Sequence, residues 1–556
     1  MNPLLALSLV LVVGALARMV LVGRHPRPER RTLVGALVGR AVERRLGGYR
    51  QRLDEGGEGL PKRLEAERTV LVVGSGIAGL TAATTLAERG FAVTLRERNP
   101  YLGGKIGAWR ERSSDGTELE VEHGFHAFFR HYYNLDEVLG RVGVRPTFKA
   151  IDDYLIVTRG DERLSFDDRV RTPLLNLLDL WSKGFFRLSD IVLTRARDQM
   201  GVFLEYDPEK TFATYDQTSF DDFAENAGLP PKLRVVFNTF SRAFFSEGDS
   251  LSVAELVKSF HFYYLSNDAG LLYDYPIDDY QVAILAPWRA YLEAHGVAIE
   301  LGRAAGAIGP TKDGFEVDGV RYDAMVLATD VAGTRRLIAS SPELAERYPD
   351  LARALAGVQS SQRYAVWRVW LDRTVRDDVP VFVNTEREVL LDSVSMYHRI
   401  TPSARSWADA NGGSVVELHS YAVPERLTDE AAVKAALRAE LDRYFPELKG
   451  ARLVHEAFQL KDDFTAFHRG LHSGRPTTET AVPGLVLAGD WVRLPCPAML
   501  MEAAATSGLL AANRLLAREG LRPEPVYTVP RRGLLPFRER PLPGEVRATP
   551  VLETAS

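Results

Sequence analysis

The chain has 556 residues, and a single hydrophobic core usually stops growing near roughly 250 to 300 residues, so we expect at least two packing units. Hydrophobic residues make up 46% and charged residues 26%, which excludes a disordered or collagen-like chain. The net charge of −5 does not indicate a nucleic-acid-binding protein. The single cysteine, Cys496, excludes an intrachain disulfide framework and a structural zinc site built on several thiolates.

The chain begins with an apolar segment. Residues 4–22 are apolar except for Arg18, and as a helix they would span about 28 Å, close to the roughly 30 Å hydrocarbon core of a bilayer. We therefore expect residues 1–23 to form a membrane anchor or a helix that lies on the membrane. Two alternatives stay open. One is a cleaved signal peptide, although no Lys or Arg precedes the apolar run, and the other is an amphipathic helix docked on the body.

A basic neck follows. Residues 24–52 carry nine arginines against two glutamates, so residues 1–68 sum to +6 and the remaining 488 residues to −11. A positive flank of an apolar segment favours the cytoplasmic side and is attracted to an anionic leaflet. We expect residues 24–68 to be a neck and linker at the membrane surface, with the body on the cytoplasmic side. A solvated charged helix over 33–53 is the alternative.

Residues 69–97 carry a dinucleotide-binding pattern. An apolar run at 70–73 predicts a buried parallel strand, the sequence GSGIAG follows at 74–79, residues 80–88 favour a helix, and residues 91–97 predict a second strand. Glycines in this spacing allow a tight turn, close backbone approach to a pyrophosphate, and close helix–strand packing. The phosphates would then meet free N–H groups at the start of the helix. The residues expected to bind the cofactor here are Gly74, Ser75, Gly76, Ala78, Gly79 and Glu97.

Two further segments favour FAD over NAD. A glycine doublet directly after the second strand would let a loop pass closely over the pyrophosphate. Far downstream, a strand at 484–488 ends in Gly-Asp, and an apolar helix from about 502 to 516 can aim its positive N-terminus at a flavin or a phosphate. The chain has no second GxGxxG run, so we expect no built-in NAD(P)H domain. As a separate expectation, we predict no metal site. The residues expected to bind FAD here are Gly103, Gly104, Lys105, Gly489, Asp490 and Glu502.

These motifs, in this order, resemble the flavin-dependent amine oxidase and carotene desaturase superfamily. More narrowly, the chain resembles the carotenoid aryl-ring (φ-ring) synthases. The closer resemblance rests on EHGFHAFFR at 122–130, YYNL at 132–135, FSRAFF at 240–245, FHFYYL at 260–265, WLDR at 370–373 and GSVVELH at 413–419. It covers about residues 68–516.

The resemblance implies an FAD-dependent oxidoreductase that dehydrogenates a β-ionone ring of a carotenoid, with a 1,2-methyl shift that yields an aromatic ring. The partners it implies are an apolar carotenoid, a membrane surface and an electron acceptor that the sequence does not identify. A desaturase or isomerase of the linear polyene, an amine-oxidase-type flavoenzyme and a binding protein without turnover are the alternatives.

Proton removal from the ring needs a base whose pKa lies near neutrality, and histidine suits this best. The resemblance places the segment around His126 close to the flavin, so His126 is the first candidate, with His123 and Glu122 next. A purely structural hydrogen bond is the competing interpretation of each. Cys496 as a covalent flavin link is a minor alternative to a buried thiol.

Aromatic side chains near these histidines can either form a substrate tunnel or belong to the core. They are Phe125, Phe128, Phe129, Tyr132, Tyr133, Phe244, Phe245, Phe260, Phe262, Tyr263 and Tyr264. Residues 174–191 predict a helix that either dips into lipid or packs in the core.

The predicted fold is α/β. A discontinuous Rossmann-type FAD-binding domain would comprise residues 69–125, 296–335 and 478–518. An inserted α+β substrate domain would comprise residues 126–295 and 336–477, with strands near 366–371 and 414–418. Residues 519–556 are rich in proline and are expected to form neither helix nor sheet.

Overall fold

The computed structural model describes residues 33–539 apart from short gaps. The gaps are residues 54–55, 114, 152–154, 166–171, 183–198, 200, 230–233, 235–236, 239–241, 271 and 428. The predicted membrane segment 1–23, the neck residues 24–32 and the end of the tail, 540–556, lie outside the described residues. Within the described part, no helix is both long and apolar enough to cross a bilayer.

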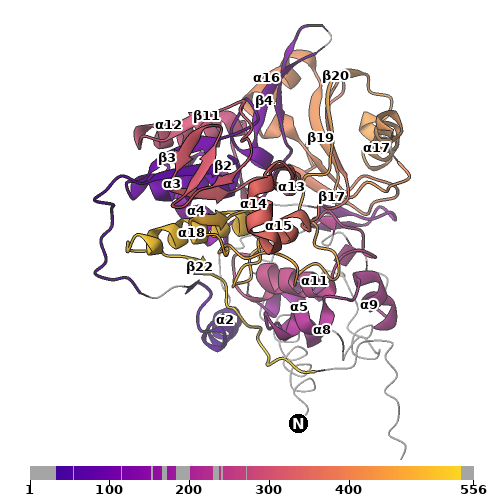
Figure 1. Cartoon of the computed structure of the whole chain (residues 1–556). Coiled ribbons are helices and arrows are strands. Elements are labelled where there is room, and N and C mark those ends of the chain that lie inside the picture. The colour runs from indigo at the N-terminus through magenta and orange to yellow at the C-terminus, as the bar shows by residue number, and fades with distance from the viewer. Residues whose placement is uncertain are drawn as a thin grey trace, which may run out of the picture.

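A five-stranded parallel sheet holds the dinucleotide motif (Figure 1). Its order is β11 (Ala298–Glu300), β3 (Ala92–Arg96), β2 (Thr69–Val73), β15 (Ala324–Leu327) and β21 (Leu485–Leu487), with every neighbouring pair parallel. Strand β2 is buried from Val70 onward, as its continuous apolar run predicts for a strand covered on both faces. The predicted α/β fold with a parallel sheet is confirmed. The strands come from the three segments that the sequence assigned to the cofactor-binding domain.

Helices α3 (Ile77–Glu88) and α18 (Leu500–Arg518) pack together against this sheet. Glycine at position 508 of α18 lets the two helix backbones approach closely. A Cβ added there would lie only 2.4 Å from the carbonyl oxygen of Ala78 in α3. Helices α4 (Tyr133–Arg141) and α12 (Ala286–Ala294) extend this layer. Both belong to the segment predicted as substrate domain, but they pack on the cofactor-binding helices. A small sheet covers the other face with three helices: β12 (Gly309–Pro310), β13 (Phe315–Val317), β14 (Val320–Tyr322), α13 (Val331–Ala339), α14 (Pro342–Arg347) and α15 (Pro349–Ala356).

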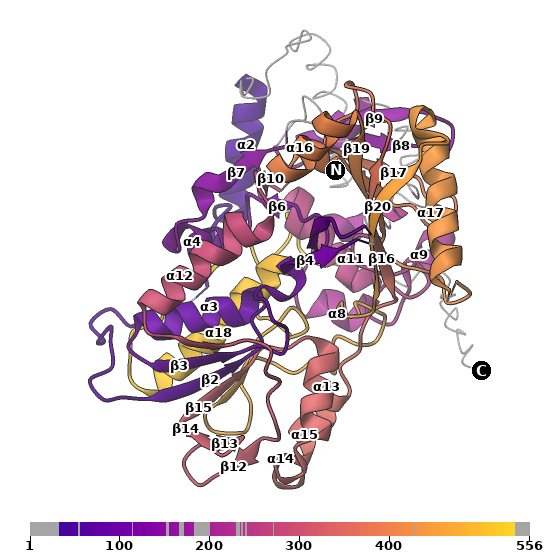
Figure 2. The same cartoon turned by 90° about the horizontal axis from the view of Figure 1, so that it is seen from above.

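A seven-stranded sheet forms the second body (Figure 2). Its order is β20 (Leu453–Lys461), β16 (Tyr364–Leu371), β19 (Ser414–Ser420), β18 (Ser393–Ser395), β17 (Phe382–Thr385), β8 (Leu155–Val157) and β9 (Arg163–Ser165). The strands predicted at 366–371 and 414–418 are β16 and β19. Every residue of β16 is buried, because one hydrophobic core that includes α17 (Glu430–Tyr444) and another near α16 (Pro402–Asn411) cover its two faces.

The remaining elements are shorter. The helices are α5 (Leu175–Ser182), α8 (Lys210–Tyr215), α9 (Phe220–Asn226), α11 (Val253–Phe260), and the π-helical turns η4 (His261–Leu265) and η5 (Gln281–Leu285). Helices α5, α8, α9 and α11 lie together below the two sheets in Figure 1. The strands are β6 (Phe128–Phe129), β7 (Phe148–Ala150) and β10 (Tyr273–Pro276), together with the hairpin β4 (Ala108–Arg112) and β5 (Glu118–Glu122). Helix α5 covers the start of the helix predicted at 174–191, whose residues 183–191 lie outside the described residues.

The tail differs from its prediction. Strand β22 (Tyr527–Thr528) pairs antiparallel with β1 (Gln51–Arg52), which follows α2 (Leu33–Leu46). The side-chain amide of Asn513 donates to the carbonyl oxygen of Glu524 at 2.9 Å and accepts from the Glu524 N–H at 2.8 Å. It thus makes the two hydrogen bonds that a neighbouring strand would otherwise make with this residue. The prediction that the tail forms no sheet was wrong for these residues, because side chains and a short edge strand satisfy its backbone and an edge tolerates proline.

Candidate functional site

A cavity of about 930 Å³ joins the dinucleotide fingerprint to side chains of the second body. Its walls include Gly76 at the fingerprint, Glu97 at the end of β3, the His123–Ala127 segment, and Tyr364 and Tyr421 of the seven-stranded sheet. This volume lies toward the upper end of the roughly 300 to 1,000 Å³ usual for cofactor and small-molecule sites. One cavity is therefore large enough to hold a cofactor at one end and part of a substrate at the other.

The three glycines of the fingerprint have different surroundings. A Cβ at Gly74, whose φ is +101°, would lie 2.6 Å from the carbonyl oxygen of Ala328, and one at Gly79 would lie 1.9 Å from the carbonyl oxygen of Gly74. A Cβ at Gly76 would meet nothing within 4 Å, and Gly76 caps the N-terminus of α3. The backbone thus needs glycine at 74 and 79 for its own packing, whereas Gly76 opens onto empty space beside free N–H groups. That arrangement fits a pyrophosphate.

The predicted glycine doublet lies directly against this turn. Gly103 donates its N–H to the carbonyl oxygen of Ser75 at 3.0 Å, and a Cβ at Gly104 would lie 3.1 Å from the Cα atom of Gly76. Lys105 Nζ then lies 3.4 Å from Asp490 Oδ2. The two glycine motifs and the downstream Gly-Asp therefore meet at one wall, although Lys105 and Asp490 are 385 residues apart in the sequence.

Glu97 lines the cavity at the end of β3. Its Oε2 accepts hydrogen bonds from Ser75 N at 2.9 Å and Ser75 Oγ at 2.8 Å, and its Oε1 accepts from Asn99 N at 2.9 Å. The carboxylate is therefore fixed beside the fingerprint, where the sequence expected it to meet a ribose.

The start of α18 also faces the cavity, through Leu500, Met501 and Ala504. Glu502 does not: its carboxylate is buried and accepts from Asn134 N at 2.9 Å, Asn134 Nδ2 at 2.9 Å and Leu135 N at 3.0 Å. Burial raises the pKa of Glu502 to about 8 against these hydrogen bonds, which lower it. Glu502 therefore ties α4 to α18 from behind the wall and is not among the residues that line the cavity.

The other predicted cofactor residues are found together. Gly79 packs α3 onto its turn, and the following residues line the cavity itself: Gly74, Ser75, Gly76, Ala78, Glu97, Gly103, Gly104, Lys105, Gly489 and Asp490.

Four aromatic side chains cluster in the wall of the cavity, and we call Phe245, Tyr364, Tyr421 and Phe464 the aromatic box. The rings of Phe245 and Phe464 stack with centroids 3.5 Å apart. Tyr364 lies 5.0 Å from Phe464 and 5.2 Å from Phe245, and Tyr421 lies 5.4 Å from Phe245. Because Phe245 and Phe464 stack on each other and Lys105 Nζ lies 4.4 Å from the Phe464 centroid, the four rings form an apolar wall against which a hydrocarbon ring can pack.

The sequence identified only part of this aromatic wall. Of the eleven aromatic residues proposed for a tunnel, Phe125, Tyr132 and Phe245 line the cavity, and the others pack in the hydrophobic cores: Phe128, Phe129, Tyr133, Phe244, Phe260, Phe262, Tyr263 and Tyr264. Tyr364, Tyr421 and Phe464 were missed. They are single residues in or beside strands, where an aromatic side chain by itself signals only a buried position.

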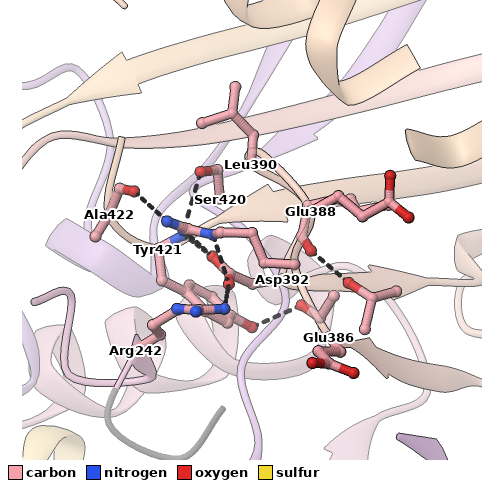
Figure 3. A network of polar contacts seen from close by, with 12 residues as sticks. Arg242, Glu386, Glu388, Leu390, Asp392, Ser420, Tyr421 and Ala422 are labelled. Carbon is pink, nitrogen blue, oxygen red and sulfur yellow. Dashed lines mark hydrogen bonds and ion pairs between the residues drawn. The ribbon is translucent and has the colours of Figure 1, made fainter. Parts of the chain in front are cut away.

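A buried polar network holds Tyr421 in the box. Tyr421 donates its N–H to Asp392 Oδ2 at 2.7 Å and shares a 2.7 Å hydrogen bond between its hydroxyl and Ser393 Oγ. Figure 3 shows Arg242 and Tyr421 both facing Asp392. Arg387 pairs with Asp392 and donates from Nη1 to Glu247 Oε1 at 2.7 Å. Each buried charge has an opposite partner, so the network can fix the position of the ring.

His126 lines the cavity as a neutral imidazole. Its Nδ1 donates to the carbonyl oxygen of Gly124 at 2.8 Å, because a carbonyl only accepts, and its backbone N–H donates to the hydroxyl of Tyr280 at 2.7 Å. Burial, with His123 nearby, lowers the pKa of His126 to about 4. The near-neutral pKa that made His126 the first candidate base is therefore absent.

His123 has a different environment. Its Nε2 lies 2.7 Å from the hydroxyl oxygen of Tyr364 and 3.4 Å from Asp463 Oδ2, and the Tyr364 hydroxyl donates to Asp463 Oδ1 at 2.7 Å. Burial lowers the pKa of His123, and the hydrogen bond and charge of Asp463 oppose that effect. Sequence reasoning named His123 but not the two residues that hold it.

Glu122 lies behind the wall in a buried ion-pair cluster. It accepts from Arg368 Nη2 at 2.8 Å and from Tyr280 N at 2.8 Å, and Arg368 also donates to Glu417 Oε2 at 2.7 Å. The Arg368 guanidinium carbon lies 3.5 Å from the ring centroid of Tyr397. These contacts use the carboxylate of Glu122 to hold the second sheet against β5, so its candidacy as a base loses its geometric support.

Cys496 is buried beside a second cavity of about 770 Å³ and does not line the first. Burial raises the pKa of its thiol to about 12. A thiol in this state is a poor nucleophile, which supports a structural interpretation of Cys496.

Comparison with known proteins gives consistent matches. The family model for flavin containing amine oxidoreductases matches residues 77–516. A carotenoid phi-ring synthase of Streptomyces griseus is 40% identical over 84% of this chain and 90% of its own length. The enzyme of the same name from Chlorobaculum tepidum is 28% identical over 85% of this chain and 92% of its own length. The structure of putrescine oxidase bound to putrescine aligns with a TM-score of 0.58 over 82% of this chain and all of that chain, at 16% identity, which supports the fold alone.

Proposed function

Because the chain belongs to the flavin containing amine oxidoreductase family and, within it, to the carotenoid phi-ring synthases, we propose that it converts a β-ionone end ring of a carotenoid into an aromatic ring. The reaction would remove four hydrogens from each ring and move one geminal methyl group to the neighbouring carbon. The observation that carries this proposal is the single cavity that joins the glycine fingerprint to the aromatic box.

FAD is the cofactor we assign to this cavity. The open space at Gly76 beside the start of α3 suits a pyrophosphate, and Glu97 lies where a ribose hydroxyl would be held. When bound, FAD would supply the two-electron acceptor that takes hydride from an allylic ring carbon. The second motif of a built-in NAD(P)H domain does not occur in the sequence, so an external acceptor would have to remove the electrons.

The aromatic box would seat the end ring. A hydrocarbon ring offers no hydrogen-bonding group, so its binding must come from burial of apolar surface. The methyl shift passes through a carbocation, which the tyrosine rings of the aromatic box can stabilise, and the box as a whole would exclude the water that would capture it. The ionised network behind Tyr421 keeps the box rigid, which maintains this geometry.

The test is to express the chain in cells that accumulate β-carotene and to analyse the pigments by mass spectrometry and NMR. Aromatic end rings with an unchanged carbon count are the expected result. Unchanged β-carotene in cells where the protein demonstrably holds flavin would contradict the proposal. New double bonds in the polyene with both rings intact would instead identify a linear desaturase.

We also propose that the protein is associated with a membrane and that its body lies on the cytoplasmic side. The support is the apolar segment 1–23 followed by the arginine-rich neck, together with a substrate that dissolves in lipid. Deletion of residues 1–23 should move the protein from the membrane fraction to the soluble fraction without loss of flavin. Unchanged fractionation would contradict the anchoring role.

A further inference from the structure

We propose that His123 is the base that takes a proton from the end ring during aromatisation, and that Tyr364 and Asp463 are the positioning residues that hold it and balance its charge. This inference rests on the proposed function and adds the residues that perform its proton transfer. It selects one histidine among the three that line the cavity, which are His123, His126 and His419.

The three side chains form a hydrogen-bonded relay. The Tyr364 hydroxyl has one hydrogen, which it donates to Asp463 Oδ1 at 2.7 Å. The 2.7 Å contact between this hydroxyl and His123 Nε2 then requires Nε2–H to be the donor. His123 therefore keeps its proton on Nε2 and presents Nδ1 as a lone pair, which is the form that a base needs.

Asp463 offsets part of the cost of proton uptake at this buried histidine. A protonated His123 would have the Asp463 carboxylate 3.4 Å from Nε2, in addition to the path through Tyr364. The other groups that act on it are Lys105, which pairs with Asp490 at 3.4 Å, and Lys461, together with the neutral ring of His126 at 6.4 Å. The nearby carboxylate thus stabilises the imidazolium that forms.

Among the described residues, neither of the other histidines has a carboxylate that is free of a direct arginine ion pair, as Asp463 is. Asp463 accepts from the Tyr364 hydroxyl and interacts with the more distant charges of Lys105 and Lys461. His126 donates only to a backbone carbonyl. His419 Nε2 lies 2.8 Å from Glu417 Oε1, but that oxygen also accepts from Phe125 N at 2.8 Å. The second oxygen of Glu417 accepts from the Arg368 guanidinium at 2.7 Å. Glu417 therefore already neutralises a fixed cation.

The location also fits the chemistry. The ring of Tyr364 belongs to the aromatic box, and the His123 ring lies 5.6 Å from it and 6.3 Å from Phe464. In each proton transfer, the C–H bond beside the ring cation breaks, its electron pair becomes a ring double bond, and the proton moves to Nδ1. Two such losses accompany two hydride removals, which together account for the four hydrogens lost from each ring.

The test uses the full-length protein loaded with FAD and β-carotene in neutral phospholipid vesicles, with a quinone added as electron acceptor so that the flavin is reoxidised and can take the second hydride from each ring. His123→Ala should reduce formation of the aromatic ring by about 10² to 10⁴-fold, and added imidazole should restore part of the rate. His126→Ala and His419→Ala are matched controls, because they open similar space in the same cavity, and imidazole should not restore their rates. Flavin absorbance reports whether each variant keeps its cofactor.

Two conservative variants test the positioning residues. Tyr364→Phe keeps the aromatic box but removes the relay, so it should lower the rate at least about tenfold. Tyr444→Phe, which removes a tyrosine hydroxyl on the remote helix α17, should not. Asp463→Asn removes the carboxylate that raises the pKa of His123, so the fall in rate at acid pH should move to lower pH, by about one unit. If Asp463 had a purely structural role, Asp463→Asn would lower the rate but leave the pH at which the rate falls unchanged.

Each outcome decides the assignment. Rescue of His126→Ala or His419→Ala in place of His123→Ala would overturn it, as would full activity of His123→Ala. If His123→Ala fails to hold flavin, Asp463→Asn decides instead. The assignment of His123 is then overturned if the rate of Asp463→Asn falls at the same acid pH as the rate of the wild-type protein. Failure of the wild-type protein to form any aromatic ring would count against the proposed function and not against the choice of base.

Discussion

At the residue scale, two glycines of the fingerprint differ in what surrounds the point where a side chain would start. A Cβ at Gly76 would meet open space, and one at Gly79 would lie 1.9 Å from a backbone carbonyl oxygen. We expect Gly76→Val to fold but to bind no flavin, because the side chain would occupy the pyrophosphate position. We expect Gly79→Val to lose several kcal/mol of stability. Flavin absorbance and thermal melting separate these effects, and a yellow Gly76→Val protein would contradict the assignment of the cavity.

The buried cation of Arg368 stabilises the contact between two buried carboxylates. Its guanidinium lies between the carboxylates of Glu122 and Glu417, and all three side chains are almost fully buried. Arg368→Met would leave two buried carboxylates without their cation and should cost about 3 to 5 kcal/mol. Arg353→Met removes a partner of Asp350 on the surface and should cost less than about 1 kcal/mol. Urea unfolding measures both, and equal losses would show that the buried cluster is not stabilising.

At the element scale, Glu502 joins two helices that are far apart in sequence. It lies in the first turn of α18 and accepts hydrogen bonds from the first turn of α4. The carboxylate therefore sits at the positive end of α4, where an anion is favoured, although burial opposes its charge. Both helices are thereby fixed next to the cavity wall.

The raised pKa of Glu502 predicts a pH dependence of stability. The folded-state pKa of about 8 exceeds the ordinary value of 4.5, so between these pH values the folded chain holds a proton that the unfolded chain has released. The stability contribution of this group is full below about pH 4.5 and is lost as pH rises through about 8. The unfolding free energy should fall by a few kcal/mol over this range, and Glu502→Gln should remove that slope. Urea unfolding at several pH values provides the measurement, and identical slopes would contradict the assignment.

At the scale of the whole molecule, the cavity is built from segments of both bodies. Its walls take residues from β2 and β3, from the start of α18, and from β16 and β19 of the seven-stranded sheet. A cofactor bound there contacts the folded chain at positions that lie far apart in the unfolded chain. Binding should therefore stabilise the molecule as one unit.

Removal of FAD should accordingly lower the melting temperature of the wild-type protein. The expected loss is about 3 kcal/mol when free FAD is at a hundred times its Kd. Gly76→Val should melt at the same temperature with and without added FAD, which makes it the control for nonspecific effects. An unchanged wild-type melting temperature after FAD removal would show that the cofactor does not bridge the two bodies.

Sequence reasoning reached the cofactor end of the site because backbone geometry leaves a signature there. Gly74 needs a positive φ and Gly79 needs the absence of a side chain, so these positions carry glycine and can be recognised by their spacing. The same reasoning did not place Glu502 behind the cavity wall, because a carboxylate near a helix N-terminus looks the same in the sequence whether it faces a ligand or caps a neighbouring helix. It also missed Asp463 and Tyr364, which follow no motif.

The sequence by itself determined the parallel sheet, the dinucleotide turn and the family, because each depends on local periodicity, on glycine conformation or on similarity along the chain. Only the tertiary structure decided how the histidines of the cavity pair with carboxylates, which aromatic rings form the box, and that the proline-rich tail pairs with the neck. Those features depend on contacts between residues hundreds of positions apart, such as His123 with Tyr364 and Asp463. No local pattern encodes such contacts, because only packing of the two sheets brings these residues together.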